Sequence, residues 1–365
     1  MKQEYIYKLL NEAGTPVQIR NLLNEFVRDF EMQNSDAWYR EVKQTDVNYH
    51  CENILLAGRV DFTSKYNKNK HELTNSELIC LFNYYYFPIL LEGSYFLFRK
   101  IWDSNFEHYF TKNNSLIFID LGCSTLPSSL AFSLVYDSFK SNNSIWKARD
   151  LKDEYHINSY VFFDKSIGST AYIKDFIDKH TGMELESAKS TSTFFNHTVE
   201  PFYRTNYSPC TDIFLEGNIH SSKGGNFNIT VPIIELFEKY AINSFQLRNG
   251  MDRYFPFSKY VLKYSQNLSF LLNISELRFS NSFDVNSLVE NLNQIIKEYP
   301  DVTLAIIYQT FDGAKTDKKW EDFKSSINFK IITKGEFSLP LDKSKSLCFE
   351  ILLRTQYDQL TNENI

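Results

Sequence analysis

The stretch 115–129 constrains the fold of this chain more than any other. An apolar run, 115–119, ends in Asp120, a short turn containing Gly122 follows, and residues 130–135 suit a helix. A strand, a glycine turn and a helix in that order place backbone N–H groups around a polar ligand at the carboxyl end of a parallel strand. The segment therefore predicts an α/β fold with a binding site where this strand ends.

A second acidic residue follows another short β-rich run. Residues 160–163 end at Asp164 and lead into a helical pattern over 171–180. In adenosine-binding α/β sheets, an acid at this place accepts hydrogen bonds from the ribose hydroxyls, because a carboxylate offers acceptors only. Asp164 lies 44 residues after Asp120 (164 minus 120), against about 20 in the usual spacing, so residues 142–158 are expected to form a polar surface insertion. Two ordinary buried strands that end in acids are the alternative.

The first segment resembles motif I of the class I methyltransferases, which bind S-adenosylmethionine (SAM). That motif usually reads Asp/Glu-x-Gly-x-Gly-x-Gly. Asp120 and Gly122 match it, whereas Ser124 and Leu126 stand where the family has its second and third glycine. The resemblance implies SAM as the cofactor, bound by Asp120, Gly122, Cys123 and Ser124.

Two further positions are expected at the cofactor site. By the same resemblance Asp164 holds the ribose. Asn273 ends the apolar run 268–273, where pocket-facing polar residues often stand in the family, although Asn-Ile-Ser is also an ordinary turn sequence. No catalytic residue is assigned. His220, in a loop after the expected strand 211–215, is a candidate general base or simply a solvated loop residue.

The order of elements extends the resemblance over residues 115–354. A helix is expected at 285–299, a strand at 302–308, a helix at 318–325 and closing strands at 327–333 and 346–354. We therefore expect a Rossmann-like, mainly parallel sheet with helices on both faces and a terminal antiparallel strand. This domain is expected to span residues 111–365.

Residues 1–110 are predicted to form a helical N-terminal region. An apolar stripe begins after Pro16, and an apolar helix is expected over 78–91, followed beyond Gly93 by a second helical piece over 94–102. In many small-molecule methyltransferases such a region covers the cofactor pocket and contacts the substrate. A purely structural cap is the alternative.

Composition excludes several classes of function. The net charge is −6, and no block of Lys and Arg is present, which argues against a nucleic-acid substrate. The five cysteines are scattered, and the histidines show no metal-ligand spacing, so neither a disulfide framework nor a metal site is predicted. The most apolar stretch is too short to span a bilayer, and the N-terminus has no apolar signal core. A cytoplasmic protein without membrane attachment is expected.

The sequence thus favours a SAM-dependent methyltransferase whose acceptor is a small molecule or a protein group. Two alternatives stay open. Residues 126–129, Leu-Pro-Ser-Ser, resemble a turn of the nicotianamine synthase-like family, which transfers the aminopropyl arm of SAM. The loss of two motif glycines also fits a catalytically degenerate scaffold that binds a protein partner, or a second copy of itself, through the helical N-terminal region.

Overall fold

The computed structural model describes residues 4–35, 75–103, 115–121, 123–136, 156–163, 172, 268–274, 285–298, 303–311 and 318–354. Several sequence predictions concern residues outside these ranges: Gly122, Asp164 and the whole stretch 181–267, which includes the expected strand 211–215 and His220. Most of the expected insertion 142–158 and the boundary between the two expected domains also lie outside them.

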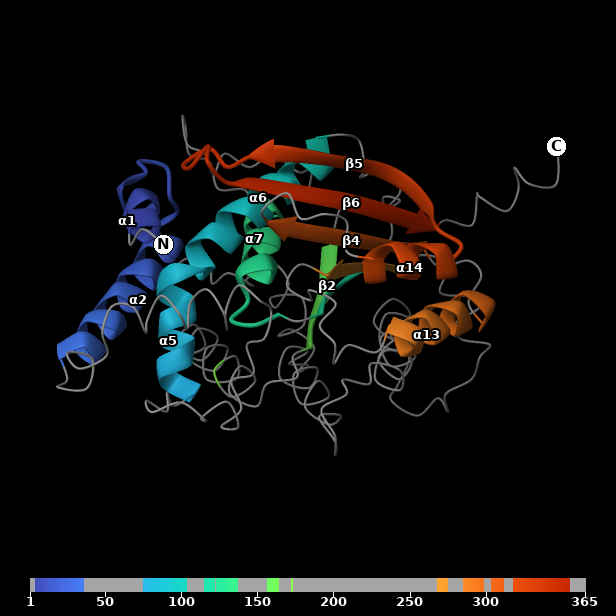
Figure 1. Cartoon of the computed structure of the whole chain (residues 1–365), viewed down its shortest axis with the longest axis horizontal. Helices are drawn as coiled ribbons and strands as arrows, with labels where there is room; N and C mark the ends of the chain where they lie inside the picture. The colour runs from blue at the N-terminus through green and yellow to red at the C-terminus, as the bar shows by residue number, and fades with distance from the viewer. Residues whose placement is uncertain are drawn as a thin grey trace.

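The described strands form one mixed six-stranded sheet in the order β2-β1-β3-β4-β6-β5. Figure 1 shows β4, β6 and β5 side by side. The strands are β1 (Ser115–Leu121), β2 (His156–Phe163), β3 (Leu268–Ile274), β4 (Thr303–Phe311), β5 (Lys330–Ser338) and β6 (Ser346–Arg354). β1 pairs in parallel with β2 and β3, and β3 pairs in parallel with β4. β6 runs antiparallel to both β4 and β5. The expected α/β fold, with parallel strands first and an antiparallel last strand, is confirmed.

Alternate residues of β4 face different helices, because successive side chains of a strand point to opposite faces of its sheet. Ala305 and Ile307 join the large apolar cluster formed with the N-terminal helices and α7 (Pro127–Tyr136). Tyr308 lies on the other face and stacks on Trp320 of α14 (Lys318–Ser326), with ring centroids 4.3 Å apart. α13 (Val285–Glu298) packs against α14.

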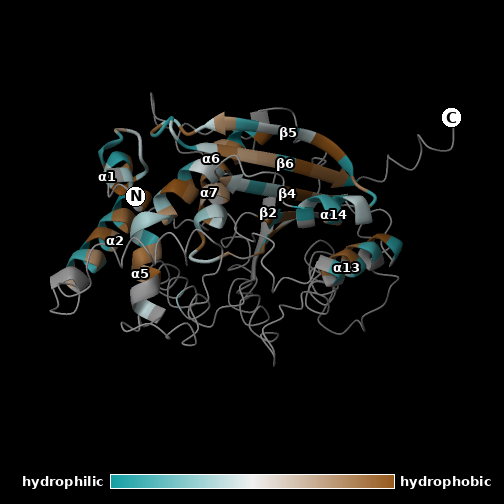
Figure 2. Cartoon of the chain, in the orientation of Figure 1, coloured by the Kyte–Doolittle hydropathy of each residue, from teal (hydrophilic) through white to brown (hydrophobic). Residues whose placement is uncertain are grey.

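The N-terminal helices belong to the same core as the sheet. They are α1 (Glu4–Asn11), α2 (Val17–Ser35), α5 (Asn75–Tyr85) and α6 (Phe87–Asp103). One cluster of buried apolar side chains runs from Tyr5 through Phe87 and Phe118 to Leu353. α6 packs along α7, which contacts β1 (Figure 1). Helix α2 has brown apolar and teal polar stripes in Figure 2, and its apolar side is buried in this cluster.

The break between the two apolar helices lies at Tyr86 and not at Gly93, where the sequence predicted it. α5 ends at Tyr85 and α6 begins at Phe87, so Pro88 lies in the first turn of α6, where a residue without an N–H is tolerated. A single continuous helix would place Pro88 in its interior, where proline removes a hydrogen bond. Gly93 lies inside α6, where a Cβ atom would come within 2.5 Å of the Phe311 ring of β4. This glycine therefore permits close packing of the helix on the sheet.

The closing hairpin also differs from its predicted bounds. β5 begins at Lys330 instead of residue 327 and continues to Ser338. Its register is set by pairing with β6, from Lys330 opposite Leu353 to Ser338 opposite Ser346. β5 is the edge of the described sheet, and in Figure 2 it mixes polar and apolar residues while β6 is largely apolar. Among the described helices, none is long and apolar enough to cross a membrane.

Candidate functional site

Three polar side chains lie at the carboxyl ends of three adjacent parallel strands. Asp120, the second-last residue of β1, lies beside Asn273 of β3. Gln309 of β4 lies two residues beyond Ile307, the neighbour of Asn273. All three side chains are buried. Asn273 Nδ2 donates to Asp120 Oδ1 at 2.8 Å, and Gln309 Nε2 donates to Asn273 Oδ1 at 3.1 Å. The strand ends therefore share one continuous hydrogen-bonded chain.

Asp120 also caps helix α7. The first helical bond runs from Leu130 N–H to the Leu126 carbonyl, so Leu126 occupies the N-cap position, where its apolar side chain has no acceptor for the free N–H groups. The Ser129 Oγ donates to Asp120 Oδ2 at 2.5 Å, and the Ser129 backbone N–H also donates to this carboxylate. Both oxygens of Asp120 are thus bound by protein groups.

Burial dominates the ionisation of Asp120. It raises the pKa of this carboxyl to about 6, although the bonds from Ser129 and Asn273 favour the charged form and lower it. At pH 7 Asp120 is accordingly ionised and acts only as a hydrogen-bond acceptor.

A ring of three polar side chains joins this chain to helix α6. Ser94 Oγ donates to Gln309 Oε1 at 3.1 Å and lies 3.0 Å from Ser128 Oγ. Gln309 Nε2 lies 3.4 Å from Ser128 Oγ. The N-terminal helical region is therefore hydrogen-bonded to the same strand ends as α7.

The loop 123–126 between β1 and α7 adopts an unusual backbone. Ser124 has φ 48° and Leu126 has φ 71°, in the left-handed region that favours glycine. A bond of 2.7 Å from Leu126 N–H to the Cys123 carbonyl closes the turn. Thr125 is buried, and its Oγ1 makes no hydrogen bond to any described residue. This orphan hydroxyl lies immediately before the N-terminus of α7.

The structure brings together four of the residues that the sequence predicted for the site. Asp120 and Asn273 are hydrogen-bonded, and the buried Cys123 and Ser124 form the loop between β1 and α7. The predicted roles of Gly122 and Asp164 concern residues outside the described part. Four network members were not predicted: Ser94, Ser128, Ser129 and Gln309.

A second buried carboxyl lies on α6 beside this network. Glu92 Oε1 accepts the backbone N–H of Leu341 at 3.1 Å, and its Oε2 has no hydrogen-bond partner among the described residues. Burial raises the pKa of Glu92 to about 8, so the side chain is mainly neutral at pH 7. It ties α6 to the β5–β6 connection.

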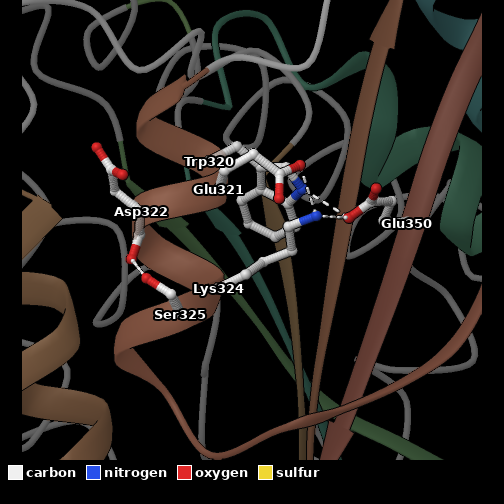
Figure 3. A network of polar contacts seen from close by, with 6 residues as sticks. All are labelled: Trp320, Glu321, Asp322, Lys324, Ser325 and Glu350. Atoms are coloured by element: carbon white, nitrogen blue, oxygen red, sulfur yellow. Dashed lines mark hydrogen bonds and ion pairs between the residues drawn. The ribbon is translucent and has the colours of Figure 1, made fainter.

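The opposite face of the sheet carries a polar network that anchors α14 (Figure 3). Glu350 Oε2 of β6 accepts from Trp320 Nε1 at 2.8 Å and from Lys324 Nζ at 2.7 Å. Lys324 also binds the exposed Glu321. Burial acts to lower the pKa of Lys324, but its bonds to the two glutamates outweigh burial and raise it. All these groups bind one another, so we assign the network to the attachment of the helix.

Comparisons with known proteins add no assignment: no protein-family model matches the chain, and no curated protein matches its sequence. Within the described ranges, no three His, Cys, Asp or Glu side chains gather to hold a metal ion.

Proposed function

We propose that the chain is a SAM-dependent methyltransferase with a Rossmann-like fold and the cofactor site at the loop 123–126 between β1 and α7. The backbone of this loop carries the proposal. Ser124 and Leu126 stand where the resembled motif has glycines, and both adopt the left-handed φ that favours glycine. A backbone that suits glycine at these two positions supports the comparison with the motif.

The order of the strands supports the same site. β1 lies between β2 and β3, so the chain leaves β1 towards one side of the sheet and returns on the other. In open α/β sheets, ligands bind at such a switch point, outside the carboxyl ends of the strands. The last strand, antiparallel between β4 and β5, is also typical of class I methyltransferases.

The residues at the loop suit a zwitterionic cofactor. The orphan hydroxyl of Thr125 is a hydrogen-bonding group without a partner among the described residues, and it precedes a helix N-terminus, which favours an anionic group. Thr125 and the backbone N–H groups of 123–125 would hold the methionine end, and Asp164 would hold the ribose. Asp120 is engaged by Ser129 and Asn273, so its part is to hold the loop and α7 in place.

When bound, SAM supplies a methyl group that is already activated by its sulfonium. The protein then has to align an acceptor with that group and exclude water, because alignment provides most of the rate. α6 joins the loop-bearing helix through Ser94 and Ser128, which favours the N-terminal helical region as the side that receives a small-molecule or protein acceptor.

Isothermal calorimetry of the full chain with SAM and S-adenosylhomocysteine tests the proposal. We expect both to bind. Thr125→Val, which replaces the orphan hydroxyl by a methyl group of similar size, should weaken binding, whereas Thr125→Ser should largely keep it. The surface variant Glu321→Gln is the control.

The products separate the alternatives once an acceptor is found. S-adenosylhomocysteine indicates methyl transfer, and methylthioadenosine indicates aminopropyl transfer. Absence of binding of either ligand to folded protein would reject the cofactor site and favour the scaffold interpretation.

A further inference from the structure

We infer that Gln309 is a positioning residue that fixes the direction of the hydrogen bonds from Ser94 and Ser128 through Asn273 to Asp120, and thereby keeps Asp120 an acceptor. Gln309 stands at the centre of the network: it contacts Ser94 and Ser128 on the helices and Asn273 on the neighbouring strand. The inference rests on the proposed function for its binding readout only.

The direction of donation follows from Asp120, which stands at the end of this hydrogen-bonded network and can only accept when it is ionised. An ionised Asp120 requires the amide NH₂ of Asn273 to face it, and the Asn273 oxygen therefore faces Gln309. Gln309 must then donate through Nε2, which leaves its Oε1 to accept the hydroxyl of Ser94. These orientations are fixed by the chemistry of the partners.

The ring on α6 and α7 completes the assignment. The single hydrogen of the Ser94 hydroxyl goes to Gln309, so in the 3.0 Å contact between the serines the Ser128 hydroxyl donates to Ser94. Ser128 can then accept the second N–H of Gln309, at 3.4 Å. Every donor in the ring points to an acceptor, so the network has one consistent direction when Asp120 is charged.

Reversing any amide breaks this direction. If residue 309 presented only an acceptor, Asn273 would turn its NH₂ towards it and present an oxygen to the Asp120 carboxylate. Two facing acceptors repel, and a buried carboxylate that loses its donor is destabilised relative to its protonated form. Protonated Asp120 is a weaker acceptor than the carboxylate for the hydroxyl and backbone N–H of Ser129, so the cap on α7 is weakened.

Gln309→Glu and Gln309→Leu form the matched pair that tests the inference. Both variants lose the Gln309 amide, but only the glutamate places a second acceptor-only group against Asn273 when it is ionised. We expect the ratio of SAM affinities, Gln309→Glu over Gln309→Leu, to fall about tenfold between pH 5.5 and pH 8, the effect of a pKa difference of one unit. The urea midpoint of Gln309→Glu should also fall relative to Gln309→Leu over this range.

A wild-type measurement covers the case in which neither variant folds. The side-chain amide NMR signals of Asn273 and Gln309 should shift together with one midpoint as pH crosses the titration of Asp120, and Asp120→Asn should abolish both shifts. Signals of Gln309 that ignore pH, or an affinity ratio that is constant with pH, would overturn the inference. Failure of the wild type to bind SAM would instead reject the proposed function. The urea and NMR measurements would still test the role of Gln309, because neither depends on SAM.

Discussion

Replacing Asp120 by asparagine should change how the stability of the protein depends on pH. The side chain keeps its shape, and its oxygen can still accept the amide of Asn273, but the ionisable group is gone. In the wild type, burial moves the pKa of Asp120 from 3.8 to about 6. A shift of roughly two units corresponds to about 3 kcal/mol between the two protonation states.

The sign follows from proton linkage. Between pH 3.8 and about 6 the folded wild type keeps a proton on Asp120 that the unfolded chain has released. The unfolded state therefore binds fewer protons, and the stability of the wild type falls as pH rises through this window. Below the window the contribution of Asp120 is fully present, and above pH 7 it is lost.

Urea unfolding followed by tryptophan fluorescence measures this effect in both proteins at pH 4, 5, 6 and 7. The free energy of unfolding of Asp120→Asn, relative to wild type, should rise by about 2 kcal/mol from pH 4 to pH 7, because the unfolded chain has already released part of its proton at pH 4. The lost bond to the Ser129 N–H adds a constant penalty of about 1 kcal/mol but no slope. A flat difference would show that the carboxyl is not shifted, and a falling one would show that the hydrogen bonds outweigh burial.

Three other substitutions test the loop, the helix packing and the α14 network by the same unfolding assay. Ser124→Gly should leave stability within about 1 kcal/mol of wild type or raise it. Ser124→Val should lower stability by about 1–3 kcal/mol, because a β-branched residue is strained at φ 48°. Equal effects of the two substitutions would contradict the left-handed backbone at this position. Gly93→Ala should lower stability by about 1–3 kcal/mol despite the better helix propensity of alanine, because its Cβ meets the Phe311 ring. A gain in stability would show that the ring moves freely. Glu350→Gln should lower stability by about 1–3 kcal/mol and alter tryptophan fluorescence. The stability of the exposed variant Glu321→Gln should stay within about 0.5 kcal/mol of wild type. Similar losses for the two variants would refute the central role of Glu350.

The regular elements around the site could be predicted because their signals are local. The apolar run before Asp120 and the polar end of β3 at Asn273 fix where two strands stop, and parallel pairing then brings the two ends together. The signal for the break at Tyr86 is equally local, because proline is tolerated in the first turn of a helix but not in its interior. The sequence prediction places the break at Gly93 instead, where the structure has a continuous helix.

The rest of the network depends on contacts between distant segments. Gln309 follows the predicted strand end by one residue, and only the continuation of β4 to Phe311 places it in the core. A polar residue within a buried apolar strand was the available signal. Ser94 carries no such signal, because a serine in a helix is equally compatible with either face; its contact with Gln309 spans 215 residues.

A loop that keeps a left-handed backbone without glycine needs support from its surroundings. Two such residues, Ser124 and Leu126, cost about 1–3 kcal/mol each. The bonds that Asp120 accepts from Ser129 and Asn273 involve a charged group, and such bonds contribute about 1.5–3 kcal/mol each. Burial of the Asp120 charge opposes this contribution at pH 7, so the bonds do not offset the strain of the turn. Loss of one of them would instead leave a buried charge without its donor and destabilise the loop further. The polar chain through Gln309 therefore maintains the loop geometry from which the cofactor site was inferred, and variants that weaken the chain should relax the loop before they unfold the sheet.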